Sequence, residues 1–130
     1  MILLDTHVVI WLALELTKIT RKARTAIEEA RRNGQGIAIS DITLLEIATL
    51  ERKGRIRLSA GLGTFLSEVE ARFVVLPITA RTCVLTLGLP AAYPKDPADR
   101  VIGATALAEG LPLVTADREI RKTKAVRTIW

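Results

Sequence analysis

The segment Ile2-Leu3-Leu4-Asp5-Thr6 decides the fold. Its first three residues form an apolar run that is too short for a helix, and the run is followed by Asp5 and Thr6, residue types that cap helices. The same kind of run returns at Ile37-Ala38-Ile39, before Ser40, at Leu113-Val114-Thr115, and at residues 73–76. None of these runs alternates apolar and polar residues, as a strand with one solvated face would. They predict short strands of a parallel sheet that is covered on both faces.

Helical segments lie between these runs. Thr20 opens a helix that Gly34 closes, and Asp96 with Pro97 opens another. Helices are expected at residues 6–14, 21–33, 41–53, 62–71, 79–87 and 97–109, and a fifth strand at 126–129. The order predicts an α/β fold in one domain, residues 1–130, built as a three-layer α/β/α sandwich around a short parallel sheet.

The chain is both basic and apolar. It has 19 lysine and arginine residues against 14 aspartate and glutamate residues, a formal net charge of +5 and a predicted pI near 9.9, which suggest a polyanionic partner. Aromatic residues make up only 4%, so a platform for stacking single-stranded bases is poorly supplied. Hydrophobic residues make up 49%, and we expect part of that surface to lie between two copies of the chain, as in a homodimer.

The chain contains one cysteine, Cys83, so no disulfide can form within it. Cys83 stands near Val84 and Leu87 and is expected to pack as a small apolar side chain. No targeting segment is recognisable, and the apolar stretch 8–14 is far too short to cross a bilayer. These features predict a cytoplasmic protein that does not enter a membrane.

Four acidic residues fall at or just beyond the carboxyl ends of the predicted strands, or in the first turns of the following helices: Asp5, Glu46, Asp99 and Asp117. In a parallel sheet these ends share one edge, where open α/β sheets bind ligands. Asp5 and Asp117 could equally cap helices, and the helix dipole favours an acid at the position of Asp99. Glu46 stands in an apolar helix and needs a partner, either a metal ion or a basic residue. Asp96 is assigned to helix capping alone.

Close carboxylates repel one another unless a proton or a cation lies between them. Hard oxygen ligands select Mg²⁺ or Mn²⁺, ions that hold phosphate, activate water and stabilise a leaving oxygen. With the four acids set aside, the rest of the chain is more basic still than its net charge of +5, which suits a surface that attracts a phosphate backbone. The combination favours metal-dependent cleavage of nucleic acid.

Several other chemistries are excluded by the residues present. His7 is the only histidine, so neither a metal-free ribonuclease with two catalytic histidines nor a zinc site of cysteine and histidine ligands is available within one chain. No phosphate-binding P-loop and no Gly-x-Ser-x-Gly motif occurs. A haloacid-dehalogenase-like phosphatase would need a second aspartate where His7 stands, and the acidic pair and late lysine of a receiver domain are not in place.

Four segments carry a wider pattern. In chain order they are Leu3-Leu4-Asp5-Thr6-His7, Ile39-Ser40-Asp41-Ile42-Thr43-Leu44-Leu45-Glu46-Ile47, Asp96-Pro97-Ala98-Asp99-Arg100 with Ile102-Gly103-Ala104-Thr105-Ala106, and Leu113-Val114-Thr115-Ala116-Asp117. This ordered set, which spans nearly the whole chain, resembles the PIN-domain family and within it the VapC-type toxins.

The resemblance implies a Mg²⁺- or Mn²⁺-dependent endoribonuclease, the toxin of a type II toxin–antitoxin pair, that hydrolyses RNA phosphodiester bonds with a metal-activated water. It implies Asp5 and Asp99 as the main metal ligands and Glu46 and Asp117 as supporting catalytic acids. Asp99 is preferred to Asp96 because it precedes the apolar, alanine-rich stretch, as the third acid of the family does.

Thr6 and Thr115 match positions at which hydroxyl groups steady the site in this family. His7 is a departure, because many members have asparagine or serine there. VapC-type toxins usually dimerise and are neutralised by a small antitoxin whose tail covers the acidic site, so a homodimer and a cognate antitoxin are expected partners, besides the RNA substrate.

Two other functions remain open at this point. The first is a PIN-type nuclease or RNA-binding subunit that works in RNA maturation and has no toxin role. The second, from another class, is a phosphate-binding or phosphotransfer α/β domain. Metal-dependent cleavage of RNA would rule against it.

Overall fold

The computed structural model of the protein describes residues 1–130 and contains a five-stranded sheet in which every pairing is parallel. The strand order is β3-β2-β1-β4-β5, so the first strand of the chain lies at the centre of the sheet. Leu3 is paired with Ala38 on one side and with Leu113 on the other. The strands are β1 (Ile2–Leu4), β2 (Ile37–Ser40), β3 (Val74–Leu76), β4 (Leu113–Val114) and β5 (Thr128–Ile129).

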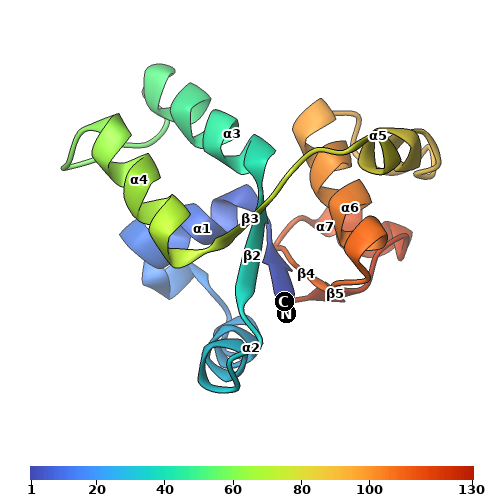
Figure 1. Cartoon of the computed structure of the whole chain (residues 1–130), viewed down its shortest axis with the longest axis horizontal. Coiled ribbons are helices and arrows are strands. Elements are labelled where there is room, and N and C mark those ends of the chain that lie inside the picture. Colours follow the sequence, from blue (N-terminus) through green and yellow to red (C-terminus); the bar gives the residue numbers. More distant parts are fainter.

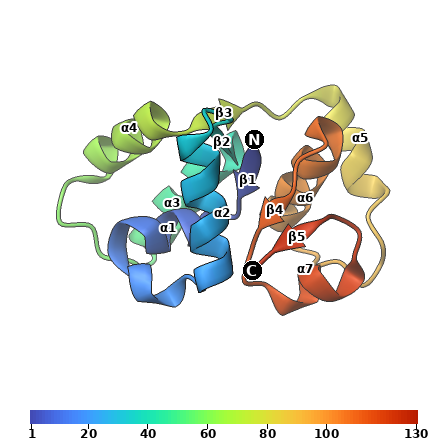
Figure 2. The same cartoon turned by 90° about the horizontal axis from the view of Figure 1, so that it is seen from below.

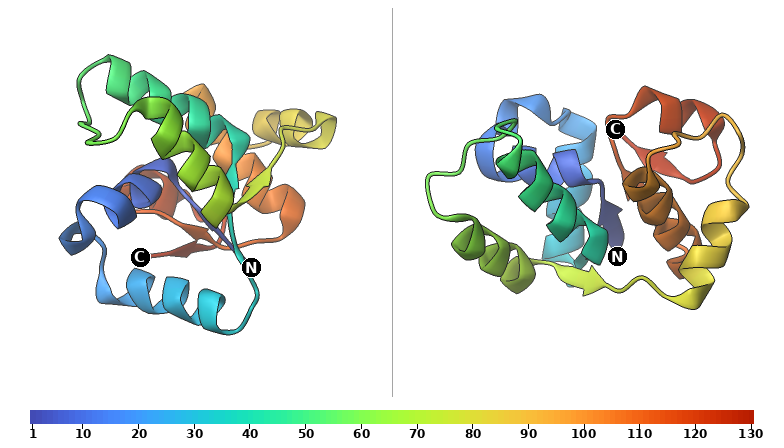
Figure 3. Two further views of the ribbon diagram at one scale, coloured as in Figure 1. Left: turned by 60° about the vertical axis from the view of Figure 1, so that its left-hand side comes forward. Right: turned by 90° about the horizontal axis from the view of Figure 1, so that it is seen from above.

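Helices cover both faces of the sheet, which confirms the predicted three-layer sandwich. Helices α1 to α4 lie on one side and α5 to α7 on the other (Figures 1 and 2; right panel of Figure 3). They are α1 (Thr6–Leu14), α2 (Arg21–Arg32), α3 (Asp41–Arg52), α4 (Leu62–Arg72), α5 (Ala80–Leu87), α6 (Pro97–Glu109) and α7 (Arg118–Thr123), with a short 3-10 turn, η1 (Leu16–Lys18), after α1.

Alternate residues of the central strand enter two different cores. Ile2 and Leu4 pack with the first group of helices, where Ile27 and Ile47 are also buried. Leu3 faces the opposite core, which is built on α6, α7 and the loop before α6. Both faces of β1 are therefore buried, and this explains why the strand segments carry no polar alternation.

The carboxyl ends of β1, β2 and β4 each lead directly into a capped helix. The side chains of Asp5, Ser40 and Asp117 accept hydrogen bonds from the first N–H groups of α1, α3 and α7. Because parallel strands have their carboxyl ends at one edge of the sheet, these three helices begin side by side. That edge positions the candidate site.

The prediction for Cys83 is wrong. Its side chain is exposed, and its neighbours Val84 and Leu87 are 68% and 87% exposed. Helix α5 packs on α6 with its opposite side, where Thr82 is buried. The apolar residues of α5 thus form an uncovered surface and do not extend the core.

The remaining differences concern the ends of elements. β3 begins at Val74, β4 ends at Val114, and β5 is confined to Thr128–Ile129, so each is shorter than the sequence predicts. The last turn of α2 ends at Arg32. No helix in the structure has the length and apolar character needed to span a membrane.

Gly103 allows the ring of Tyr93 to pack directly against α6. Tyr93 is 1% exposed, and a Cβ atom added to Gly103 would lie 2.2 Å from the tyrosine hydroxyl oxygen. Because the ring is enclosed by the core on α6, it cannot swing into solvent to make room.

We expect Gly103→Ala to lower the free energy of unfolding by about 1–3 kcal/mol, through overpacking against Tyr93. Gly63→Ala is the matched control, since a Cβ there meets nothing within 4 Å in α4 and alanine favours a helix. Urea denaturation of both variants measures the difference. Equal stabilities would show that Tyr93 adapts without cost.

Candidate active site

The carboxyl edge of the sheet carries Asp5, Glu46, Asp99 and Asp117, and we call this group the acidic edge. Asp5 is its most buried carboxylate. It follows the central strand and is 7% exposed. Its Oδ1 accepts a hydrogen bond from the Thr6 N–H at 2.8 Å, and its Oδ2 accepts one from the Thr115 hydroxyl at 2.7 Å. Burial raises the pKa of Asp5, whereas the hydrogen bonds from Thr115 and Thr6 counteract that rise. The two hydroxyl residues expected near the site are thus both in contact with the acidic edge.

Glu46 reaches the same edge from the second turn of α3. It accepts a hydrogen bond from the hydroxyl of Thr6, whose oxygen also lies 3.1 Å from that of Thr43. The alternative of an ion pair with a basic residue is not realised, because the one ion pair of the structure joins Lys18 and Glu15. Burial raises the pKa of Glu46, and the negative charges of neighbouring acids add to the rise.

Asp99 lies in the first turn of α6, and it is the one of the four acids whose carboxylate accepts no hydrogen bond from the protein. Burial, followed by the negative charges of nearby acids, raises its pKa to about 7. No hydrogen bond from the protein offsets this rise. The acids that act on Asp99 are Asp5, Asp96, Glu46 and Asp117. All four acids predicted from the sequence therefore lie within one electrostatic field.

Asp117 is a helix cap as well as a member of this field. Its Oδ1 accepts hydrogen bonds from the N–H groups of Glu119 and Ile120, at 2.8 and 3.2 Å. The Thr115 hydroxyl that donates to Asp5 also accepts from the Asp117 N–H at 3.1 Å. A single threonine therefore fixes the geometry of two of the predicted acids.

Two residues near the acids were not assigned to the site from the sequence. Asp96 caps α6 as expected, with 2.9 Å between its Oδ1 and the Ala98 N–H, but its charge also raises the pKa of both Glu46 and Asp99. Tyr93 has a buried hydroxyl without a hydrogen-bond partner, and its pKa is raised by burial and by Asp5, Asp99 and Asp117. The position of the only tyrosine, in a proline-punctuated loop just before α6, was the available signal.

The carboxylates of the acidic edge have the donor atoms of a metal site but not the geometry of a complete one. No three acidic, histidine or cysteine side chains converge closely enough to form a complete ligand cluster. Asp5 and Asp99 nevertheless fit a hard divalent cation, because they offer only oxygen donors and neither forms an ion pair, although the charge of His7 acts to lower the pKa of Asp5. The elevated pKa of Asp99 has the sign expected where a positive charge would relieve repulsion.

The parallel sheet and the acids at its carboxyl edge agree with the family to which comparison with known proteins assigns the chain. The chain belongs to the PIN domain family, whose family model matches residues 2–126. It is 34% identical over 131 residues to Ribonuclease VapC22 of Mycobacterium tuberculosis, a match that covers 99% of this chain and 98% of the relative. The resemblance to VapC-type proteins is thereby confirmed.

Solved structures give the same fold. The DNA-bound VapBC of Salmonella typhimurium superposes with a TM-score of 0.69 at 26% identity, and the match covers 98% of this chain and 97% of that chain. VapBC2 of Rickettsia felis, bound to a DNA fragment from its promoter, gives a TM-score of 0.73 at 19% identity with the same coverage. The second match supports the architecture alone.

We expect the metal-free protein to lose stability as the pH rises from about 4 to 8. The pKa of Asp99 is higher in the folded state than its ordinary value of 3.8, so in this range the folded state binds more protons than the unfolded state. Because water screens this partly buried carboxylate, we expect its contribution to be about 1–2 kcal/mol, below the value of the full pKa shift.

Thermal unfolding in EDTA at pH 5 and pH 8 measures this loss, which should be smaller in Asp99→Asn than in the wild-type protein. The control is Glu119→Gln, which removes an exposed carboxylate of α7 and should leave the pH dependence unchanged. An Asp99→Asn protein with the full wild-type loss would contradict the assignment.

Proposed function

We propose that this protein is a divalent-metal-dependent endoribonuclease and the toxin of a type II toxin–antitoxin pair. The carrying observation is the acidic edge: four carboxylates share one electrostatic field, in a chain that is 34% identical over nearly its whole length to a ribonuclease. The formal net charge of +5, carried by a chain that also holds this group of acids, suits a polyanionic substrate such as RNA. The reaction is hydrolysis of an RNA phosphodiester bond.

Asp5 and Asp99 would hold the cation, Mg²⁺ or Mn²⁺, with Glu46 and Asp117 in support. The bound cation supplies charge neutralisation at the phosphate and activation of the attacking water. The hydroxyl of Thr115 keeps Asp5 oriented, and the hydroxyl of Thr6 keeps Glu46 turned toward the same edge. A raised pKa makes Glu46 a better proton acceptor than a free carboxylate, a property that deprotonation of water requires.

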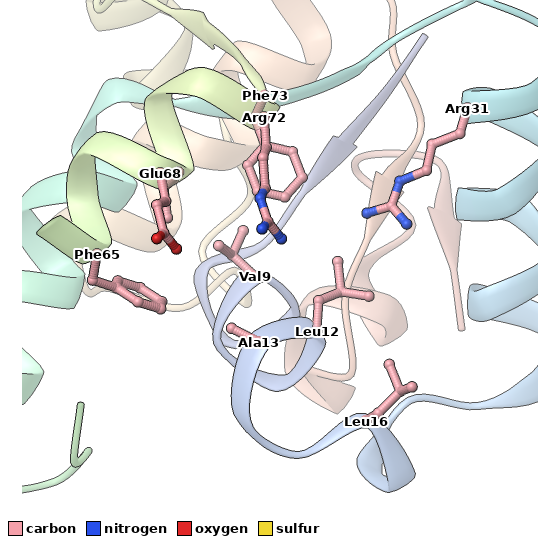
Figure 4. A pocket seen from close by; sticks show the side chains of 10 residues that line it. Val9, Leu12, Ala13, Leu16, Arg31, Phe65, Glu68, Arg72 and Phe73 are labelled. Carbon is pink, nitrogen blue, oxygen red and sulfur yellow. The ribbon is translucent and has the colours of Figure 1, made fainter. Parts of the chain in front are cut away.

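The partner that restrains this activity is an antitoxin. The neighbouring VapBC structures are complexes of this kind, and the acidic edge offers two oxygens per carboxylate to the fork of an arginine side chain. A second feature that suits a protein partner is a cavity between α1, α2 and α4, whose lining side chains are shown in Figure 4. Its volume is about 270 Å³. Its walls include Val9, Leu12 and Phe65, and Arg31 and Arg72 lie at its border.

We further propose that the protein forms a homodimer and that it acts in the cytoplasm, where RNA is available. The exposed Val84 and Leu87 of α5 support an interface, because side chains of this size are seldom left uncovered together on a monomer. Both proposals are separate from the assignment of the acids.

Asp5→Asn and Asp99→Asn should each reduce RNA cleavage to the background level while leaving the fold intact. Each substitution removes one charge that the cation needs and relieves repulsion in the metal-free protein. The assay compares Mg²⁺, Mn²⁺ and EDTA, with Glu119→Gln as a control that also loses one negative charge. If Asp5→Asn retains wild-type turnover in Mg²⁺, the ligand assignment is wrong.

Inhibition by the antitoxin should depend on one basic side chain that enters the acidic edge. Its guanidinium would make charge-assisted bidentate hydrogen bonds, and apolar residues of the same segment would cover the neighbouring surface. The test is to copurify the protein encoded beside this gene and to replace its basic residues one at a time. Inhibition that survives every such replacement, but not apolar truncations, would indicate a different mode of binding.

A further inference from the structure

A cleft of about 690 Å³ runs from the acidic edge along the space between α1 and α3. Glu46 and Asp96 lie at its acidic end, and His7 stands beside them. Lys53 and Arg55, which follow α3, line its other end. Because Glu46 and Lys53 are about two helical turns apart, the two ends are separated by about 10 Å along α3.

Two aromatic rings, those of His7 and Trp11, line this cleft, and the ring of Trp130 lies next to that of Trp11. The centroids of His7 and Trp11 are 5.8 Å apart, and those of Trp11 and Trp130 are also 5.8 Å apart, with interplanar angles of 52° and 50°. His7 is the exposed outer ring of the row, and Trp11 is half-buried behind it. Although Phe, Trp and Tyr make up only 4% of the chain, the fold brings His7, Trp11 and Trp130 into one row, and His7 lines the cleft together with Glu46.

The two basic side chains at this end of the cleft have no acidic partner. Lys53 and Arg55 are exposed and form no ion pair, since the single ion pair of the structure joins Lys18 to Glu15. Unpaired cations at this distance from an acidic centre complement a nucleic-acid backbone in which one phosphate reacts at the acids and a phosphate further along the strand is only held.

We propose, on the basis of the proposed ribonuclease function, that this cleft binds the nucleotide next to the cleaved bond. Its base stacks on His7, with Trp11 and Trp130 as support, and a following phosphate is bound by Lys53 and Arg55. A base can reach His7 only when it is unstacked from its own strand, so the site selects single-stranded RNA.

The charge contact is tested with Lys53→Ala/Arg55→Ala in an Asp5→Asn background, which prevents cleavage. Fluorescence anisotropy follows a labelled single-stranded oligouridylate over a series of salt concentrations. We expect affinity to fall about tenfold, and the salt dependence to become shallower by about 1.4 in slope, since each phosphate contact to a single strand contributes about 0.7.

The control double variant is Lys22→Ala/Arg32→Ala, in the same background. It removes two exposed cations of α2 that do not line the cleft, so it lowers the net charge equally. Its salt slope should equal that of the Asp5→Asn protein. An equal effect of the two double variants would show that only the overall charge matters, and would overturn the proposal.

The stacking contact is tested with His7→Ala and His7→Phe, both in the same Asp5→Asn background. His7→Ala should weaken binding of the oligouridylate about fivefold or more, whereas His7→Phe should restore it, because phenylalanine keeps a ring but not the imidazole nitrogens. Double-stranded RNA of the same length should not distinguish the two variants. Equal binding by both variants would exclude a role in stacking.

Failure of this proposal can be separated from failure of the proposed function. If wild-type protein cleaves RNA and the cleft variants bind it unchanged, the nuclease assignment stands and the nucleotide path lies elsewhere. If the cleft variants keep RNA binding but lose the antitoxin, the cleft is a protein-docking surface and the proposal is overturned. If the wild-type protein neither binds nor cleaves RNA, both proposals fall.

Discussion

The carboxylate of Asp5 is buried at the end of the central strand, and such a group needs hydrogen-bond donors on both oxygens. One donor is the backbone of the next residue, and the other is the hydroxyl of Thr115, which is 110 positions away in the sequence. Satisfying Asp5 therefore requires β1 and β4 to lie side by side in the correct register. The same hydroxyl accepts the Asp117 N–H, so the start of α7 is set by the same contact.

The carboxylates of the acidic edge repel one another, and the fold holds them together. Asp99 receives no hydrogen bond, and the charges of its neighbours oppose its ionisation. Two buried cores, one on each face of the sheet, hold the elements that carry these acids. A stable scaffold thus keeps together groups that would separate if they were free, which is the usual relation between a functional site and the fold that supports it.

Local rules predicted much of this arrangement. Asp5, Ser40 and Asp117 cap helices directly after apolar strands, and the sequence shows both parts of that pattern. Contacts between distant segments were not predictable in this way. The exposure of Cys83 depends on which side of α5 meets α6, and the side that is buried there carries Thr82, whereas Val84 and Leu87 are exposed, so hydrophobicity does not reveal the choice.

The candidate site shows the same division. The proximity of the four acids could be predicted because strand ends converge in any parallel sheet, whereas their roles as ligands and catalysts are proposed. The effect of Asp96 on the pKa values of Glu46 and Asp99 was not predicted, because its role as a helix cap already explained its presence. The row formed by His7, Trp11 and Trp130 escaped for a different reason, since Trp130 comes from the far end of the described chain and its neighbours are set by the sheet order.

The position of β1 between β2 and β4 has a consequence for synthesis on the ribosome. At a translation rate of about 5–20 residues per second, Thr115 follows Asp5 after roughly 5–20 seconds. Throughout that interval one side of the central strand is unpaired, and neither β4 nor Asp117 is available to complete the acidic edge. The acidic edge of the nascent protein therefore stays incomplete until almost all of its chain has emerged.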